Sequence, residues 1–125
     1  MINAVNWLEI PVKDYNRAKK FYSAILDAEV TDHPMPTPDV QYGILPYDRE
    51  KNGVGGALIQ AEGQNPTTEG MTLYLPGGDD LATPLSRVEA AGGRIIQPKT
   101  NIGENGFMAQ FIDTEGNRLA LHSMN

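Results

Sequence analysis

Two side chains in this sequence could move protons near neutral pH, Glu9 and His122. The chain has two histidines and no cysteine, so acid–base chemistry has few candidates and thiolate chemistry has none. Glu9 and His122 could act together as general base and acid. Each also has a structural interpretation that stays open: Glu9 as an ion-pair partner of Arg118 or Lys13, and His122 as a histidine hydrogen-bonded to backbone near the chain end.

The single tryptophan, Trp7, lies two positions before Glu9. Alternate residues of a strand point to the same side, so the indole and the carboxylate share a face. A flat indole can stack on an aromatic ligand or bind a cation over its ring. It can equally serve as packing that fills a cavity, and the residues alone leave both interpretations open.

Motifs for other chemistries are missing from the sequence. There is no Ser or Cys nucleophile motif and no G-x-G-x-x-G phosphate loop. Gly53, Gly55 and Gly56 surround a predicted strand and do not open a helix. Asp79 and Asp80 are typical of helix capping, so we do not interpret them as a paired acid and base.

The elements that position these side chains are clearest in the closing hairpin. Residues 107–112 and 117–123 are predicted strands, joined by a turn over residues 113–116. Gly116 supplies the positive φ of the turn, and Asp113 can hydrogen-bond the turn backbone. In the last strand, Leu119 and Leu121 point to one face. The opposite face is small and polar, as in a cavity lining, and comprises Arg118, Ala120 and His122.

The first half of the chain predicts a strand, a helix and three more strands. The helix spans residues 15–27 behind the N-cap residue Asp14, with an apolar stripe at helical spacing. Three prolines predict a loop from His33 to Pro38. The predicted strands are residues 4–12, 29–31, 40–45 and 54–60.

The second half repeats this order after a polar linker over residues 61–70. Asp79 or Asp80 begins a helix that Gly92 and Gly93 end. The other predicted elements are strands over 71–75 and 94–96, a loop over 98–105, and the closing hairpin. The distance from Asp14 to Val30 equals that from Asp80 to Ile96, which indicates an internal duplication at a spacing of 66 residues.

Composition sets the broad class. The 125 residues suit one domain, built from a first module over about residues 1–62 and a second over about 70–125. A net charge of −6 disfavours nucleic acid and anionic membrane surfaces as partners. We find no secretory signal and no apolar run long enough to span a bilayer, so we expect a cytoplasmic protein.

Several motifs together resemble the vicinal oxygen chelate superfamily, which contains glyoxalase I, bleomycin-resistance proteins and extradiol dioxygenases. The resemblance covers nearly the whole chain. The matching segments are residues 9–14, 17–22, 80–81, 87–93 and the Asp-x-x-Gly-Asn hairpin at 113–118. It implies an α+β fold of two βαβββ modules that form a curved mixed sheet around a cleft. It also implies a homodimer.

Metal enzymes of that superfamily place His or Glu on the first and last strands of each module. In this sequence the resemblance puts those positions at Trp7, at Thr72, at Ala120, and at one of Gly56, Ala57 or Leu58. An indole and a methyl group cannot coordinate a divalent ion. His33 lies in the proline-rich loop, where we expect it at the surface. We therefore expect no metal ligands and no cofactor.

The resulting expectation is a metal-independent protein that binds a small, aromatic or cationic organic molecule. The residues expected to line its cleft are Trp7, Glu9, Thr72, Tyr74, Arg118, Ala120 and His122, with Gln60 as a further candidate. The alternative is a lyase, isomerase or dioxygenase with an atypical site on Glu9 and His122. A third possibility is a subunit whose cleft is filled by its own side chains and which acts through partner binding.

Overall fold

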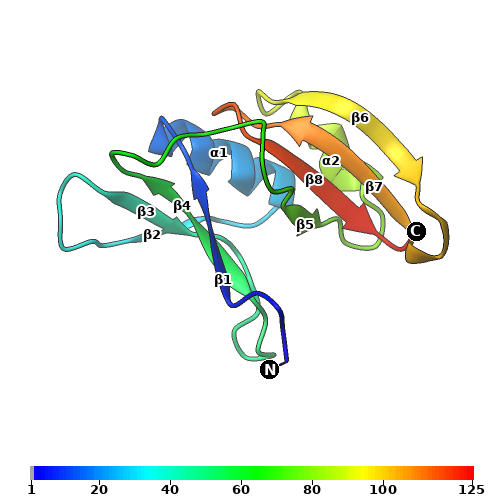
Figure 1. Cartoon of the computed structure of the whole chain (residues 1–125), viewed down its shortest axis with the longest axis horizontal. Coiled ribbons are helices and arrows are strands. Elements are labelled where there is room, and N and C mark those ends of the chain that lie inside the picture. The colour runs from blue at the N-terminus through cyan, green and yellow to red at the C-terminus, as the bar shows by residue number, and fades with distance from the viewer. Residues whose placement is uncertain (1) are drawn as a thin grey trace. The chain divides into compact units, whose positions relative to one another are not determined.

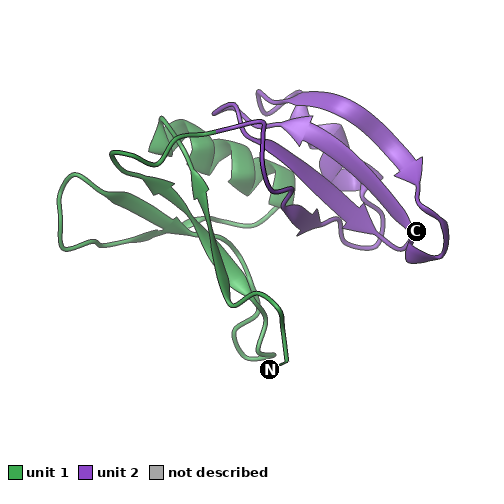
Figure 2. Cartoon of the chain, viewed as in Figure 1, with its two compact units in different colours: residues 1–66 green, residues 67–125 purple. Residues whose placement is uncertain are grey.

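The computed structural model describes residues 2–125, which form two compact units. Unit 1 comprises residues 1–66 and unit 2 residues 67–125 (Figure 2). Each unit consists of a four-stranded mixed sheet and one α-helix. No helix within residues 2–125 is both long enough and apolar enough to cross a membrane.

Unit 1 has the order strand, helix, strand, strand, strand (Figure 1). Its sheet runs β1-β4-β3-β2, with β1 and β4 parallel and the other neighbours antiparallel. The elements are β1 (Trp7–Pro11), α1 (Tyr15–Leu26), β2 (Thr31–His33), β3 (Gln41–Ile44) and β4 (Gly55–Gln60).

Helix α1 packs against one face of this sheet because its apolar residues fall on one stripe. The side chain of Asp14 accepts a hydrogen bond from the backbone N–H of Arg17, which caps the N-terminus as predicted. The buried stripe of α1 comprises Tyr15, Ala18, Phe21, Tyr22 and Ile25. It fixes which residues of β1 face the core: Ile10 is buried, whereas Trp7 and Glu9 are exposed.

Unit 2 repeats the topology of unit 1. Its sheet runs β5-β8-β7-β6, again with the first two strands parallel and the rest antiparallel. The elements are β5 (Tyr74–Pro76), α2 (Ala82–Val88), β6 (Arg94–Asn101), a 3-10 turn η1 (Gly103–Asn105), β7 (Phe107–Ile112) and β8 (Arg118–Ser123). The predicted α+β fold of two βαβββ modules is confirmed by this repeated order.

The β7–β8 hairpin turns as the sequence predicts. Gly116 adopts φ 98°, a backbone conformation that is strained for a residue with a side chain. Asp113 is buried, and its Oδ1 accepts hydrogen bonds from the backbone N–H groups of Glu115 and Asn117 at 2.8 Å each. The Asn117 side chain donates to the other carboxylate oxygen of Asp113 and accepts from Thr67 N–H. One buried carboxylate thus fixes the turn, and Asn117 links that turn to the start of unit 2.

Some predicted boundaries were wrong in unit 1. The strand expected over residues 4–12 is shorter, and the one expected over 29–31 begins at Thr31 and includes His33. His33 pairs with Tyr42 of β3, so a strand position replaces the expected loop position. The proline loop starts only at Pro34, because backbone pairing with β3 outweighs the effect of the prolines that follow.

Unit 2 departs further from the prediction. β5 covers only Tyr74–Pro76, and α2 begins at Ala82 and ends at Val88, before Gly92 and Gly93. The Asp80 side chain still accepts a hydrogen bond from Ala82 N–H. β6 runs to Asn101 through Pro98, where a loop was expected. Proline is tolerated there because β6 is an edge strand whose register shifts on both sides of Gln97.

Candidate functional site

The sheet face of unit 1 opposite α1 carries the candidate site. Trp7 and Glu9 of β1 lie on this face, opposite Gly55 and Ala57 of the neighbouring strand β4. Gly55 has no side chain, and the Tyr47 ring occupies the space that a Cβ would need there, while Ala57 carries only a methyl group and is fully buried. Tyr42, from β3 on the other side of β4, reaches across β4 to the side chains of β1.

A hydrogen-bonded chain joins these three side chains. The Trp7 indole Nε1–H donates to the Tyr42 hydroxyl oxygen at 2.9 Å. The Tyr42 hydroxyl in turn donates to Glu9 Oε2 at 2.6 Å, a length typical of a hydrogen bond to an ionised acceptor. Strand alternation correctly predicted that Trp7 and Glu9 share one face of β1. We call this trio the Trp7–Tyr42–Glu9 chain.

The electrostatics favour a protonated phenol within this chain. Burial of the phenol raises the pKa of Tyr42, as does the hydrogen bond to Glu9, while the hydrogen bond from Trp7 opposes the shift. Tyr42 therefore remains a hydrogen-bond donor to Glu9 at neutral pH. Glu9 itself is exposed and makes no salt bridge with any described cation of unit 1, in contrast to the ion pair considered with Lys13.

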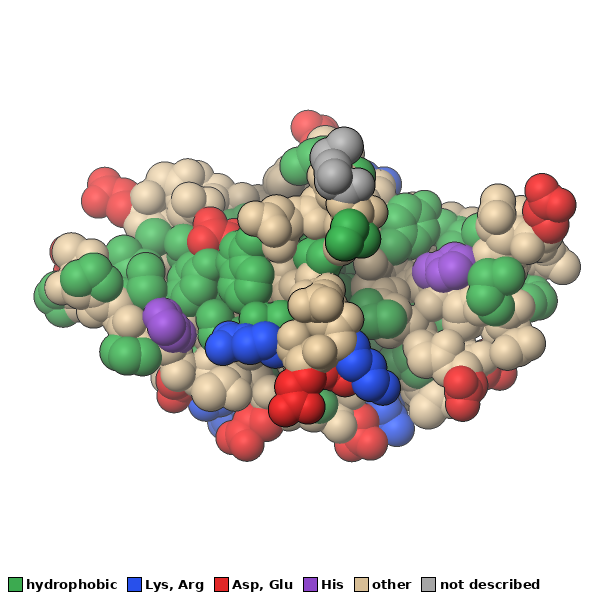
Figure 3. Space-filling view, turned by 90° about the horizontal axis from the view of Figure 1, so that it is seen from below, with side chains coloured by type: hydrophobic (Ala, Val, Ile, Leu, Met, Phe, Trp, Pro, Cys, Tyr) green, Lys and Arg blue, Asp and Glu red, His purple; other side chains and the backbone are tan. Residues whose placement is uncertain are grey.

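Further aromatic rings border the chain. The rings of Trp7 and Tyr47 lie 5.8 Å apart in an edge-to-face arrangement, and His33 meets Tyr42 in a similar way at 6.1 Å. The Arg49 guanidinium lies 5.8 Å from the centre of the Tyr47 ring, and its Nε donates to the Tyr47 hydroxyl. Hydrophobic side chains gather over unit 1 at the left of Figure 3.

Gln60 does not belong to this face. Its Oε1 accepts a hydrogen bond from the backbone N–H of Tyr15 at 2.7 Å, at the start of α1. Gln60 therefore lies on the helix side of the sheet. The prediction that it lines a cavity with Trp7 ignored the need of the first helical N–H groups for acceptors.

The other predicted site residues belong to unit 2. Tyr74 of β5 pairs with Ala120 of β8, and Thr72 precedes β5, outside any strand. His122 Nε2 lies 2.7 Å from the backbone oxygen of Asn105. This contact matches the structural interpretation of His122 considered from the sequence. A hollow of unit 2 is lined by Tyr74, Leu75, Pro76, Ile102, Asn105 and His122.

Arg118 lies at the start of β8, partly buried. Its guanidinium donates to the Gly70 backbone oxygen at 3.4 Å, a long contact. Its Nε is buried and has no hydrogen-bond partner within residues 2–125. The side chain is thus directed at the segment that leads into β5, so it is held by backbone and by no carboxylate of unit 2.

The donor set does not fit the metal of the family's metal enzymes. The β1–β4 register places Ala57 on the same face as Glu9, whereas Gly56 packs beneath Leu8. The four matching positions are thus Trp7, Ala57, Thr72 and Ala120, of which a single hydroxyl could coordinate an ion. Within residues 2–125, no three His, Asp or Glu side chains are grouped as metal ligands.

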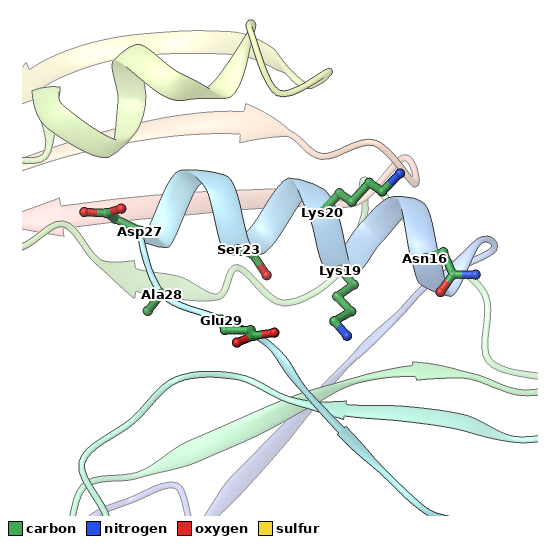
Figure 4. A pocket seen from close by; sticks show the side chains of 7 residues that line it. All are labelled: Asn16, Lys19, Lys20, Ser23, Asp27, Ala28 and Glu29. Carbon is green, nitrogen blue, oxygen red and sulfur yellow. The ribbon is translucent and has the colours of Figure 1, made fainter.

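A hollow of unit 1 lies beside α1 and is lined by side chains of both charges (Figure 4). Lys19 is already bound to Asp32 at 3.1 Å, and the same Asp32 oxygen accepts from the Tyr15 hydroxyl. The hydrogen bond from Tyr15 lowers the pKa of Asp32, and burial raises the pKa of Tyr15. These pairings hold α1 to β2. The lining residues are Asn16, Lys19, Lys20, Ser23, Asp27, Ala28 and Glu29.

Tyr42 and Tyr47 are the residues that sequence reasoning missed. A signal for Tyr42 was present, since alternation in the predicted strand over 40–45 puts Gly43 and Leu45 on one side and Tyr42 on the other. Tyr47 lies in the connection after β3, where no periodicity applies. A partner for the Trp7 indole N–H and for the Glu9 carboxylate could have been sought among such strand tyrosines.

Comparisons with known proteins give a consistent picture. The family model described as Glyoxalase/Bleomycin resistance protein/Dioxygenase superfamily matches residues 4–121. "Putative glyoxylase CFP32" from Mycobacterium tuberculosis and from Mycobacterium bovis is 28% identical over 124 residues. That match covers 96% of this chain and 45% of the relative, so the chain spans about half the length of the curated relatives it matches.

Solved structures share the fold at low sequence identity. Glyoxalase I from Zea mays superposes with a TM-score of 0.70 at 20% identity, covering 94% of this chain and 44% of that one. A glyoxalase/bleomycin resistance protein/dioxygenase family enzyme from Burkholderia phytofirmans PsJN has a TM-score of 0.69 at 12% identity, covering 96% and 98%. The family model and the repeated βαβββ order together show that this chain belongs to the Glyoxalase/Bleomycin resistance protein/Dioxygenase superfamily.

Proposed function

We propose that this chain is a small-molecule-binding protein of its superfamily that works without the divalent metal. The observation that carries the proposal is the Trp7–Tyr42–Glu9 chain. An indole stands at a position where the family's metal enzymes have a ligand, and its N–H is committed to Tyr42. Side chains fixed in this way present a preorganised surface to a ligand, which lowers the entropy cost of binding.

The composition of the surface supports a ligand with an apolar or aromatic part. Trp7 is 37% exposed, and its ring and that of Tyr47 meet edge to face. Aromatic side chains contribute much contact area at low conformational cost, because they have few rotatable bonds. The bordering carboxylate of Glu9 adds a polar group that can orient the bound molecule.

A thermal-shift screen of small organic molecules, run in EDTA, tests this proposal. We expect ligands that raise the melting temperature of the wild-type protein and lose that effect in Trp7→Ala. Ile96→Ala is the matched control, because Ile96 is also exposed, at 41%, but lies on β6 of unit 2. If Trp7→Ala and Ile96→Ala respond alike to every stabilising ligand, the proposal fails.

An enzyme of the same superfamily is the second candidate. The observation that favours it is the exposed Glu9 carboxylate, whose Oε1 makes no hydrogen bond within the described residues and could accept a proton. A lyase, isomerase or dioxygenase reaction would then use Glu9 as its general base. Metal analysis of the purified protein separates the two candidates: one tightly held divalent ion per chain, lost in Glu9→Gln, would favour the enzyme.

A further inference from the structure

We infer that the ligand of the Trp7–Tyr42–Glu9 chain is a protonated organic amine, an inference that rests on the binding function proposed above. Its ammonium group donates to Glu9 Oε1, and its apolar body packs against the Trp7 ring.

The hydrogen-bond roles within the chain lead to this class. The only N–H of the indole is used by Tyr42, and the only O–H of Tyr42 is used by Glu9. An ionised carboxylate has no proton to donate. These three side chains therefore present hydrogen-bond acceptors and aromatic faces to a ligand, but no free hydrogen-bond donor. The ligand must supply the donor.

Charge points the same way. Glu9 Oε2 accepts a hydrogen bond from the Tyr42 hydroxyl, whereas Oε1 accepts none within residues 2–125, and no cation of residues 2–66 forms a salt bridge with Glu9. A neutral donor would satisfy Oε1, but an ammonium group also compensates the charge. Hydrogen bonds to charged partners are roughly twice as strong as neutral ones.

The aromatic rings complete the fit. A cation within about 6 Å of a ring centre is attracted by the ring, and Trp provides the strongest such site. The Tyr47 ring already has a cation of the same protein beside it, because the Arg49 guanidinium lies 5.8 Å from the ring centre. Trp7 has no such internal cation within the described residues. Oxyanions and acceptor-only oxygenated molecules find neither a donor nor an opposite charge on these three side chains.

Three probes with the same ring and different charge test the inference: benzylamine, benzyl alcohol and benzoate. Trp7 is the only tryptophan, so its indole N–H gives a single NMR resonance that reports binding directly. We expect benzylamine to shift this resonance saturably, with a Kd about tenfold below that of benzyl alcohol, as one charged hydrogen bond implies. We expect no saturable shift with benzoate.

Glu9→Gln removes the charge but keeps an oxygen that can accept from Tyr42, so it should bring benzylamine and benzyl alcohol to similar Kd values. Glu104→Gln is the matched control, since Glu104 is an exposed acid in η1 of unit 2. Tyr42→Phe frees the indole N–H, which can then donate a hydrogen bond to benzoate. This variant should therefore bind benzylamine and benzoate with more similar Kd values than the wild-type protein does. The melting temperature of each variant shows that it is folded.

Equal Kd values for benzylamine and benzyl alcohol in the wild-type protein would overturn the inference. A preference that survives in Glu9→Gln, or the absence of any saturable shift with benzylamine, would overturn it as well. These results differ from a failure of the proposed function, in which the ligands found by screening are indifferent to Trp7→Ala. Screening hits that require Trp7 but show no preference for positive charge would overturn the inferred ligand class and would still support the proposed binding function.

Discussion

The two units share one topology and differ in what their open sheet faces carry. Unit 1 joins Trp7, Tyr42 and Glu9 by hydrogen bonds above small residues of β4. Unit 2 has Tyr74 beside Ala120 at the corresponding sheet position, and its His122 is bound to backbone. A repeated fold has therefore kept its core while the residues on its open faces diverged, so the site must be argued from those residues.

Truncating a fully buried aromatic side chain should destabilise the two units by similar amounts, and this is the largest effect that we expect. Phe21 of α1 and Phe111 of β7 are both essentially fully buried. Replacing either by alanine should lower the free energy of unfolding by about 3–5 kcal/mol, through lost burial and a cavity. Chemical denaturation measures the change. Ile96→Ala is the exposed control, and a loss below about 1 kcal/mol in one unit only would contradict equal cores.

The Asp113 turn belongs to unit 2 alone. Asp113→Ala removes the acceptor for two backbone N–H groups and for the Asn117 side chain, all buried with it. We expect a loss of about 2–4 kcal/mol in the free energy of unfolding, because buried donors are left unpaired. Asp113→Asn, which keeps one side-chain oxygen, should lose less. Equal losses in the two variants would show that the hydrogen bonds are not responsible.

Tyrosine hydroxyls compare the two open faces directly. Tyr42→Phe breaks two hydrogen bonds and should cost about 1 kcal/mol in the free energy of unfolding. Tyr74→Phe should cost less than about 0.5 kcal/mol, since the Tyr74 hydroxyl has no hydrogen bond within residues 2–125. Denaturation followed by Trp7 fluorescence gives both values. Equal costs would mean that the Trp7–Tyr42–Glu9 chain does not stabilise unit 1.

The smallest effect concerns acid stability. Hydrogen bonds from Tyr15 and Lys19 lower the pKa of Asp32 in unit 1, and those from Ala82 N–H and Lys99 lower that of Asp80 in unit 2. A carboxyl whose pKa is lowered on folding stabilises the protein above its unfolded value and loses that contribution as pH falls through the folded value.

Thermal melts between pH 5 and about 2 measure this effect. The wild-type melting temperature should fall as the pH drops below 3.8, the ordinary value of these carboxyl groups. Asp32→Asn and Asp80→Asn should each have a flatter acid limb, and both effects should be modest because both carboxyls are exposed to solvent. Glu104→Gln is the control. An unchanged acid limb in both variants would contradict the assigned pairings.

The fold was predictable because local patterns and the global topology agree. The stripe of α1, the Asp14 cap and the Gly116 turn each follow from residue type and spacing, and the equal distances in the two halves revealed the repeat. Boundaries failed where tertiary pairing outweighed local propensity, as at His33 and through Pro98. The homodimer remains a prediction.

The site was only half predictable. Strand alternation placed Trp7 and Glu9 together, but their partner Tyr42 comes from a strand some 35 residues away. Spacing along the chain carries no information about a contact made across an intervening strand. Gln60 shows the converse, since its alternation pattern could not reveal that a helix start would take its side-chain oxygen.

The most direct measurement is a calorimetric titration of a ligand found by screening into EDTA-treated protein, repeated with added Mn²⁺, Ni²⁺ or Zn²⁺. We predict the same Kd with and without each metal, and loss of binding in Trp7→Ala. Binding that appears only when a divalent ion is restored, and that persists in Trp7→Ala, would contradict it.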